Sequence, residues 1–312
     1  MSVTLAIVVP CYNEQEMLPE AAARLLALLD RLCAEGQASA DSAVYFVDDG
    51  SADRTWALIE AERARDARVH GVKLSRNCGH QRALLAGLSV ARGDAVVTID
   101  ADLQDDPEAM RAMLAHHAQG CDIVYGVRRD RGSDSAFKRG TARAYYRLLR
   151  LLGVEVVHDH ADYRLMSRRA VEHLLEYAEV NLYLRGILPL LGLRSAVVHY
   201  DRAARHAGTS KYPLVRMLAL AADGVTSFSV APLRAIALMG LVVFVLSFAM
   251  VGWVLYGKWF LNTEIPGWAS SVIPIYFLGG TQLLSIGVLG EYVAKMYLET
   301  KRRPRFFIET VL

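Results

Sequence analysis

Paired cysteines and an excess of charge of one sign are both missing from this sequence. The 312 residues carry a formal net charge of only +2, so they offer no strongly basic surface of the kind that binds nucleic acid, and we expect no nucleic-acid partner. The four cysteines, Cys11, Cys33, Cys78 and Cys121, include no CxxC pair. Scattered single thiols are typical of a reducing compartment and predict no disulfide framework.

Two glycine-rich phosphate-binding motifs are also missing. No GxGxxG follows the first apolar run, which argues against a dinucleotide-dependent dehydrogenase, and no GxxxxGK[ST] occurs, which argues against a P-loop NTPase. The first residues, MSVTLAIVVPCYNE, lack the basic start of a signal peptide and are predicted to form a strand.

Charged residues are absent from two long segments of the C-terminal part. Residues 235–257 form a run of 23 without charge, and 265–290 is a second uncharged run that contains Pro274. A helix needs about 20 apolar residues to cross a bilayer, and membrane helices tolerate proline and glycine. We therefore predict two transmembrane helices. The alternative, two buried helices of a soluble core, is disfavoured because such paired runs are rare in soluble domains.

The lysine and arginine distribution predicts the orientation of these helices. Arg216 and Arg234 precede the first run, basic residues follow the second, and the linker has one lysine balanced by Glu264. The positive-inside rule then places both termini and the N-terminal head in the cytosol, at the inner (cytoplasmic) membrane. Pro213 is predicted to begin an amphipathic helix on the membrane surface. The predicted layout is a head domain over 1–200, juxtamembrane helices over 201–234, the transmembrane helices over 235–292 and a basic cytosolic tail over 293–312.

The head alternates short apolar runs with amphipathic stretches. Near-continuous Val/Ile runs between helices predict an α/β fold, with a mostly parallel, Rossmann-like sheet covered on both faces. Ligands of such sheets bind at the carboxyl ends of the strands. The predicted strands are 5–10, 43–50, 68–75, 95–102 and 122–128, and the predicted helices are 15–34, 53–65, 80–92 and 107–119.

Acidic side chains stand at two of these strand ends. Asp48 and Asp49 end AVYFVDDG, and Asp100 and Asp102 end AVVTIDAD. Asp100 and Asp102 are two residues apart and so point the same way from an extended segment, where Gln104 adds a further oxygen. Oxygen ligands gathered in this way suit Mg²⁺ or Mn²⁺ that also holds a diphosphate. The alternative is an acidic turn before the next helix.

The head resembles family 2 glycosyltransferases with a GT-A fold in four segments: VVPCYNE, VDDGSADRT, SRNCGHQRALLAGLSVARGD and TIDADLQDDPE. More narrowly, the chain resembles polyprenyl-phosphate glycosyltransferases, the group that contains dolichol-phosphate mannose synthase and bactoprenol glucosyltransferase. This resemblance covers nearly the whole chain. It depends on the two uncharged runs and on DYRLMSRRA (162–170), RAARHAGTSKYP (202–213), GVTSFSVAPLR (224–234) and GEYVAKMYLETKRRP (290–304).

The resemblance implies a nucleotide-sugar donor and a divalent metal, Mg²⁺ or Mn²⁺. Asp100 would hold the ribose or diphosphate side of the donor. Asp102 would bind the metal, with Gln104 and Asp100 beside it. His80 stands where related chains often have a lysine, and either contacts the donor or is an ordinary polar residue at a helix start. The residues implied around the uridine are Pro10, Tyr12, Glu14, Asp48 and Asp49.

The implied acceptor is a polyprenyl phosphate, undecaprenyl phosphate in a bacterial host. Asp162 matches the acid that the family uses as a base. A phosphate monoester has a second pKa of ~6 and is mostly dianionic at neutral pH, so such an acceptor needs a base less than an alcohol does. We therefore expect Asp162 either to orient the acceptor or to act as a base. The alternative is a simple ion pair with Arg164. The cations expected to bind the acceptor phosphate are Arg128, Arg139, Arg202, Arg205 and Lys211, with Arg185 orienting a helix nearby.

The predicted activity is therefore that of a membrane-bound inverting hexosyltransferase. It would move a sugar from a UDP-sugar to polyprenyl phosphate and release UDP. Glucose is the sugar that we expect first. Other donors stay open, namely UDP-galactose, UDP-N-acetylglucosamine, a UDP-aminoarabinose derivative and GDP-mannose. A subunit of a lipid-linked-sugar translocation system is the alternative from another class, although neither uncharged run has the central ionisable residue that a polar pathway would need. We also expect a homo-oligomer.

Overall fold

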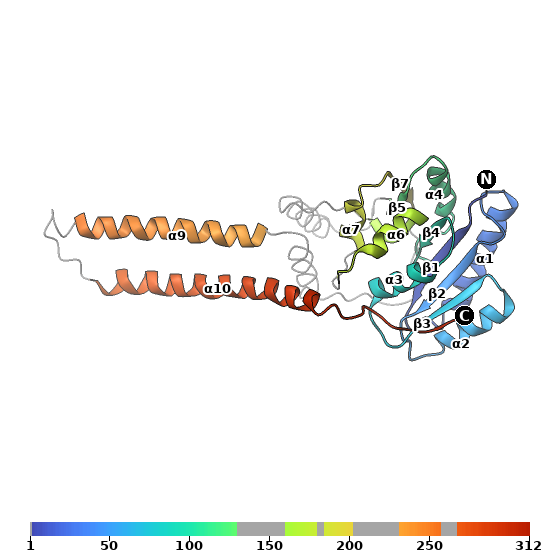
Figure 1. Ribbon diagram of the computed structural model, residues 1–312, viewed down its shortest axis with the longest axis horizontal. Helices are drawn as coiled ribbons and strands as arrows, with labels where there is room; N and C mark the ends of the chain where they lie inside the picture. Colours follow the sequence, from blue (N-terminus) through green and yellow to red (C-terminus); the bar gives the residue numbers. More distant parts are fainter. Residues whose placement is uncertain (1, 130–159, 180–183, 202–230, 257–266) are drawn as a thin grey trace. The chain divides into compact units, whose positions relative to one another are not determined.

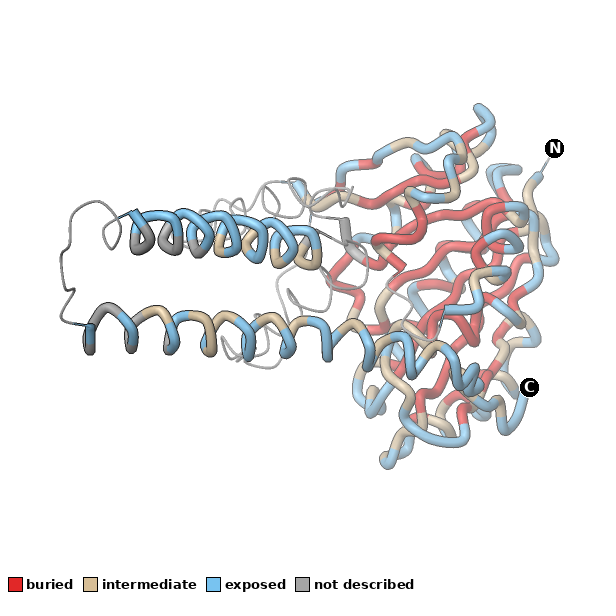
Figure 2. Tube along the Cα trace, turned by 60° about the vertical axis from the view of Figure 1, so that its left-hand side comes forward, coloured by how far each residue is buried: buried red, intermediate tan, exposed pale blue. Residues whose placement is uncertain are grey.

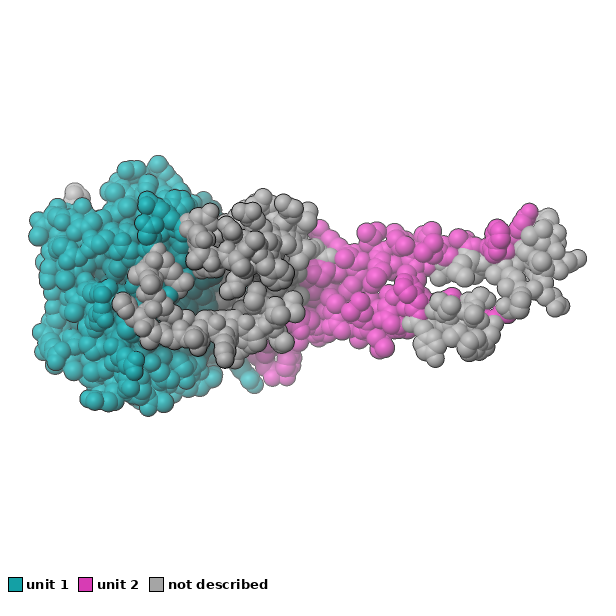
Figure 3. All heavy atoms as spheres, turned by 180° about the vertical axis from the view of Figure 1, so that it is seen from behind, with its two compact units in different colours: residues 1–146, 155–212, 302–312 teal, residues 147–154, 213–301 magenta. Residues whose placement is uncertain are grey.

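The computed structural model describes residues 2–129, 160–179, 184–201, 231–256 and 267–312. The chain divides into two compact units, which Figure 3 colours separately. The first unit is the head and contains residues 1–146, 155–212 and 302–312, and the second contains 147–154 and 213–301.

An eight-stranded sheet forms the centre of the head, in the order β7-β5-β6-β4-β1-β2-β3-β8 (Figure 1). Its strands are β1 (Leu5–Cys11), β2 (Ala43–Asp48), β3 (Val69–Leu74), β4 (Ala95–Thr98), β5 (Ile123–Arg128), β6 (His160–Ser167), β7 (Ser195–Tyr200) and β8 (Ile308–Val311). Strand β1 pairs in parallel with both β2 and β4, β2 pairs in parallel with β3, and β5 does so with β7. The prediction of an α/β fold with a mostly parallel sheet is confirmed.

Helices cover both faces of this sheet. Every residue of β1 and β2 is buried, as Figure 2 shows in red for the middle of the head, and this explains their continuous apolar sequences. Alternate residues of β1 pack into a core with α1 and α4, while α3 and α6 contact the opposite face. The helices of the head are α1 (Leu18–Ala34), α2 (Thr55–Arg65), α3 (His80–Val90), α4 (Ala109–Ala118), α6 (Arg168–Glu176) and α7 (Leu184–Leu190).

Helix α3 lies unusually close to the sheet, and Gly87 is the reason. A Cβ atom added at Gly87 would lie 2.4 Å from Val8 Cγ1 and 2.7 Å from Val47 Cγ2. Because only a hydrogen fits there, α3 can pack directly on β1 and β2. This contact places the start of α3 beside the carboxyl ends of those two strands.

Strands β6, β7 and β8 were not predicted from the sequence. Strand β6 runs antiparallel between β4 and β5, and so breaks the parallel pattern in the middle of the sheet. It lacks a continuous apolar signal because Asp162 and Arg164 alternate with the core residues Tyr163 and Leu165. Alternation of charge with apolar residues is the sign of a strand with one polar face, and here that face belongs to the site described below.

The C-terminal residues also differ from the expected tail. Helix α10 (Trp268–Thr300) continues past the predicted boundary at 292, and the following residues return to the head. Strand β8 pairs antiparallel with β3, and Lys73 Nζ lies 3.1 Å from a carboxylate oxygen of Glu309. Arg305 donates to the backbone carbonyl of Tyr177. The end of the chain is therefore part of the sheet.

The second unit contains α9 (Ala231–Tyr256) and α10, which contact each other. The two predicted membrane spans fall mainly on these helices. Among the residues that the structure describes, however, no helix is long and apolar enough to cross a membrane. The spans therefore stay a prediction from the sequence. The amphipathic helix predicted from Pro213 lies outside the described residues.

Replacing Gly87 tests the close packing of α3. We expect Gly87→Ala to lower the free energy of unfolding by about 1–3 kcal/mol, because the stiff side chains of Val8 and Val47 cannot move aside. This cost should exceed the gain in helix propensity, which is at most about 1 kcal/mol. Denaturant unfolding of the full chain measures the change. Ser89→Ala, at an exposed position of the same helix, is the control and should stay within about 0.5 kcal/mol; an unchanged Gly87→Ala would contradict the packing.

Candidate active site

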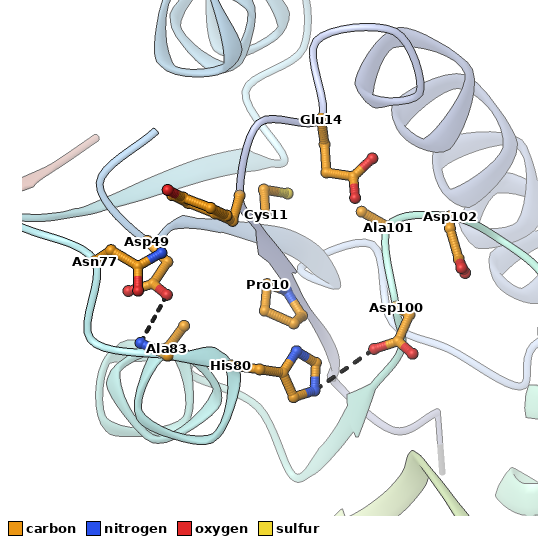
Figure 4. A pocket seen from close by; sticks show the side chains of 12 residues that line it. Pro10, Cys11, Glu14, Asp49, Asn77, His80, Ala83, Asp100, Ala101 and Asp102 are labelled. Carbon is orange, nitrogen blue, oxygen red and sulfur yellow. Dashed lines mark hydrogen bonds and ion pairs between the residues drawn. The ribbon is translucent and has the colours of Figure 1, made fainter. Parts of the chain in front are cut away.

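A cavity of about 310 Å³ opens at the carboxyl ends of β1, β2 and β4 (Figure 4). Parallel strands bring their carboxyl ends to one edge of a sheet, so residues far apart in the sequence meet there. The cavity is lined by Pro10, Cys11, Tyr12, Glu14, Asp49, Asn77, Gly79, His80, Ala83, Asp100, Ala101 and Asp102.

Most of the residues predicted to bind the donor are among those that line this cavity. Tyr12 leaves 49% of its surface exposed there. Asp48 and Gln104 do not line the cavity, and both are buried. Asp48 instead accepts a hydrogen bond from the backbone N–H of Ser51, at 3.0 Å. The predicted residues that do line it are Pro10, Tyr12, Glu14, Asp49, Asp100 and Asp102.

The segment DDGSADRT holds the loop that follows β1. Ser51 Oγ accepts from the backbone N–H of Asn13, and Asn13 Oδ1 accepts in return from the N–H of Ala52. Thr55 Oγ1 accepts from the N–H of Glu14, at 2.9 Å. Asn13 needs this support because its backbone has a left-handed φ of 55°. The polar residues after β2 therefore fix the wall of the cavity that Tyr12 and Glu14 form.

Asp49 fixes a second wall. Its two carboxylate oxygens accept from the backbone N–H groups of Cys78 and Gly79, at 2.7 and 2.9 Å, just before α3 begins. Figure 4 marks one of these two contacts with a dashed line beside the labelled Asp49. Burial raises the pKa of Asp49, and the two hydrogen bonds oppose that shift. The carboxylate still borders the cavity, and each oxygen has a further lone pair for a ligand.

Asp100 and Asp102 enter the cavity from the loop after β4. Burial raises the pKa of Asp100; the charge of His80 opposes the shift, and the neighbouring acids add to it. Among the described residues, no three His, Cys, Asp or Glu side chains come together as a metal site. Two carboxylates still fit Mg²⁺, which proteins commonly bind through one or two carboxylates, several waters and substrate phosphates. Gln104 contributes its backbone N–H to Asp102 Oδ1, at 3.2 Å.

Asp162 is the centre of a charged cluster next to the cavity. The side chain is 10% exposed, and Arg164 Nη2 donates to its Oδ1. Arg185 Nη2 and His80 Nε2 each lie 3.3 Å from Oδ2, and the same His80 atom lies 3.7 Å from Asp100 Oδ1. His80 therefore links Asp100, the acid expected on the donor side, with Asp162, the acid expected to act on the acceptor. Figure 4 shows its contact with Asp100.

These contacts favour an orienting role for Asp162 over a base. Burial alone would raise its pKa, but the hydrogen bond from His80 and the charges of Arg164 and Arg185 hold it well below its usual range. Such a carboxylate accepts a proton poorly at neutral pH. Burial alone would lower the pKa of His80, whereas its bond to Asp162 and the charges of Asp100 and Asp162 raise it, which favours the imidazolium.

Of the five cations predicted to bind the acceptor phosphate, the structure describes one. Arg128 forms a two-point contact with Asp105, with Nε 3.0 Å from Oδ1 and Nη2 3.2 Å from Oδ2. Its guanidinium is thus already engaged by a buried carboxylate. The other four lie outside the described residues: Arg139, Arg202, Arg205 and Lys211.

The sequence did not identify two residues of this site. Asn77 and Gln81 belong to RNCGHQ, the segment in which only His80 stood out. Asn77 lines the cavity, and Gln81 Nε2 donates to Asp162 Oδ2, at 3.3 Å. A polar residue before or in the first turn of a helix carries no chemical signal by itself, so only the position of β6 gives Gln81 its partner.

Removing the charge of Asp162 tests its electrostatic role. We expect Asp162→Asn to lower the free energy of unfolding by about 3–5 kcal/mol near neutral pH, because it leaves the buried Arg164 without a counter-charge. The pKa of Asp162 is strongly depressed in the folded protein, so its contribution is complete above the unfolded pKa of about 3.9, declines below that pH and is lost only as the pH falls through the much lower folded pKa. The difference between the two proteins should therefore shrink in acid.

Urea unfolding of the full chain at about pH 7 and about pH 2 measures this difference. Asp201→Asn is the matched control. Asp201 lies 3.5 Å from Arg129, but its side chain is 79% exposed, so the change should cost less than about 1 kcal/mol at either pH. An Asp162→Asn cost that does not depend on pH would contradict the electrostatic explanation.

Comparison with known proteins agrees with the geometry of this site. Residues 6–175 match the family described as glycosyl transferase family 2. The chain is 50% identical over 307 residues to the uncharacterized glycosyltransferase YkoT of Bacillus subtilis (strain 168), covering 98% of this chain and 91% of the relative. It is 38% identical over 307 residues to the bactoprenol glucosyl transferase of Shigella phage SfX, covering 98% and 99%.

Among solved structures, the chain is similar to glucosyl-3-phosphoglycerate synthase from Mycobacterium tuberculosis, with a TM-score of 0.45 and 18% identity, over 72% of this chain and 76% of that one. The family match covers more than half of the sequence, and the two relatives extend over nearly all of it. The chain belongs to glycosyl transferase family 2.

Proposed function

We propose that this glycosyltransferase is a membrane-bound inverting enzyme that moves glucose from UDP-glucose to a polyprenyl phosphate, undecaprenyl phosphate in a bacterium. The observation that carries the proposal is the cavity at the strand ends, which is lined by Asp100 and Asp102 and also by the exposed Tyr12. Relatives named bactoprenol glucosyl transferase, 37–38% identical over nearly the full chain, support both the sugar and the lipid acceptor.

Each part of the nucleotide-sugar donor has a counterpart in the cavity. The aromatic face of Tyr12 suits stacking with a base, and the carboxylate of Asp49 can accept from an N–H of uracil. Asp100 and Asp102 would hold Mg²⁺ or Mn²⁺ next to the diphosphate. When bound, the metal would neutralise the negative charge that develops on the leaving diphosphate.

The charge state of Asp162 fits an acceptor that needs no base. A phosphate monoester has a second pKa of ~6, so its oxygen is already anionic at neutral pH. This oxygen attacks the anomeric carbon and forms the new C–O bond, while the bond to the diphosphate breaks and UDP leaves with the electron pair. One in-line displacement inverts the anomeric centre, and no proton has to be removed in the step.

Apolar surface on α9 supports a membrane location. Leu238, Phe244, Phe248 and Trp253 are 62–73% exposed on this helix, and apolar side chains of α10 are exposed in the same way. Isolated apolar residues are normal on a soluble surface, but a helix that is apolar all round needs an apolar environment. We propose that α9 and α10 lie in the inner membrane with the head and both termini in the cytosol, and that the protein is a homo-oligomer.

A transfer assay tests the activity. Purified full-length protein in detergent receives undecaprenyl phosphate, Mg²⁺ or Mn²⁺ and one labelled donor at a time: UDP-glucose, UDP-galactose, UDP-N-acetylglucosamine, the UDP-aminoarabinose derivative or GDP-mannose. We expect label from UDP-glucose in the organic phase. EDTA should abolish the transfer, and Asp102→Asn should lower it by at least about 100-fold because the charge of the leaving group is no longer neutralised.

The control for this assay is Asp41→Asn, which removes an exposed carboxylate from the turn before β2 and should leave the rate unchanged. Transfer from a different donor would correct the sugar and keep the reaction. A folded protein that transfers from none of the five donors would overturn the enzyme assignment in favour of a subunit of a lipid-linked-sugar translocation system.

Extraction of cell membranes tests the location. We expect the full chain to stay in the membrane pellet after washing with alkaline carbonate, because the 23 uncharged residues 235–257 match the length that crosses a bilayer. Tags at both termini should be digested by protease only in inverted vesicles. Release of the chain into the carbonate wash would rule out the spans, and cross-linking of the same membranes tests the homo-oligomer.

A further inference from the structure

The side chain of Gln81 joins three elements at the edge of the cavity. Gln81 is the second residue of α3, and its Nε2 donates to Asp162 Oδ2 of β6, at 3.3 Å. Its Oε1 accepts from the backbone N–H of Leu184, the first residue of α7, at 3.2 Å. If the Gln81 amide were flipped, its oxygen would face the carboxylate of Asp162 and its NH₂ would face the N–H of Leu184. The two partners therefore determine a single orientation of the amide.

The contact with Leu184 determines where Arg185 stands. Arg185 follows directly in the chain, and its guanidinium meets both oxygens of Asp162: Nε lies 3.4 Å from Oδ1 and Nη2 lies 3.3 Å from Oδ2. The side chain of Arg185 is still 36% exposed. Gln81 therefore holds the start of α7 and the Asp162 carboxylate together, with Arg185 between them.

Two guanidinium groups contact the one carboxylate of Asp162, those of Arg164 and Arg185. Arg164 is buried, and its Nη1 has no hydrogen-bond partner within the described part of the chain. Arg185 is partly exposed, so its guanidinium can be reached from the solvent. His80 connects these groups with the cavity that it lines. An anionic oxygen is the ligand that an accessible guanidinium group suits.

We propose that Gln81 is a positioning residue for sugar transfer: its amide fixes α7 against Asp162 and so holds Arg185 in place for an anionic phosphate oxygen of a substrate. This inference depends on the proposed transfer of a sugar to a lipid phosphate. The phosphate belongs either to the acceptor or to the donor diphosphate, and kinetics with each substrate varied in turn distinguish the two.

The first test compares the activities of four variants. We expect Gln81→Leu and Arg185→Gln each to lower kcat/KM by about 10- to 100-fold, the effect of losing hydrogen bonds to charged groups. A raised KM for undecaprenyl phosphate identifies the acceptor as the ligand of Arg185, and a raised KM for the UDP-sugar identifies the donor. Gln119→Leu, at an exposed position after α4, should not change the rate. The fourth variant combines Gln81→Leu with Arg185→Gln.

The double variant decides whether Gln81 acts through Arg185. If it does, the double variant should be no slower than Arg185→Gln by more than about twofold, because residues that act through one contact do not have additive effects. Effects that multiply would overturn the positioning role. Thermal unfolding of each variant separates a loss of positioning from a loss of fold.

Hydrogen exchange tests the same contact without any activity. The N–H of Leu184 should exchange faster in Gln81→Leu, and should keep its protection in the control Gln119→Leu. Equal exchange in Gln81→Leu and the unchanged protein would overturn the proposal. If the unchanged protein transfers no sugar at all, the proposed function fails, and hydrogen exchange still reports whether Gln81 holds α7.

Discussion

A buried carboxylate that requires counter-charges organises the active-site side of the head. Asp162 is 8% exposed within the sheet, where an unpaired charge would be costly. Its partners come from three elements: Arg164 from β6 itself, His80 from the start of α3 and Arg185 from α7. Satisfying this one charge therefore brings together β6, the start of α7 and the start of α3, where His80 lines the cavity. The antiparallel β6 is what inserts the carboxylate at this point.

The acidic residues at the strand ends divide into two groups with different tasks. Asp48 and Asp49 accept hydrogen bonds from backbone N–H groups, so their charges stabilise the loops that shape the cavity. Asp100 and Asp102 project into the cavity itself. A carboxylate in the first group fixes geometry, although Asp49 also lines the cavity, and one in the second can bind a cation. The adjacent acids of DDGSADRT thus support walls of the cavity that the acids of TIDAD also line.

The head is completed by residues from the far end of the sequence. After β7 the chain forms α9 and α10 and then returns as β8 at the edge of the sheet beside β3. The pairing of β8 with β3, together with the contact of Arg305 with the carbonyl of Tyr177, joins residues 302–312 to the rest of the head. The last strand of the sheet is therefore separated in the sequence from all the others by α9 and α10.

The sequence by itself determined the sheet from β1 to β5, the helices between these strands, and the edge at which ligands bind, because apolar runs and helical periodicity are local signals and parallel strands end on one side. It also placed Tyr12, Asp49, Asp100 and Asp102 at the cavity. Only the tertiary structure decided the rest. Gln81 and Leu184 are 103 residues apart, and their contact exists because β6 enters the sheet next to β4, which no periodicity encodes. A charge such as Asp162 has no fixed role in a sequence, since its pKa and its partners depend on which distant residues the fold packs around it.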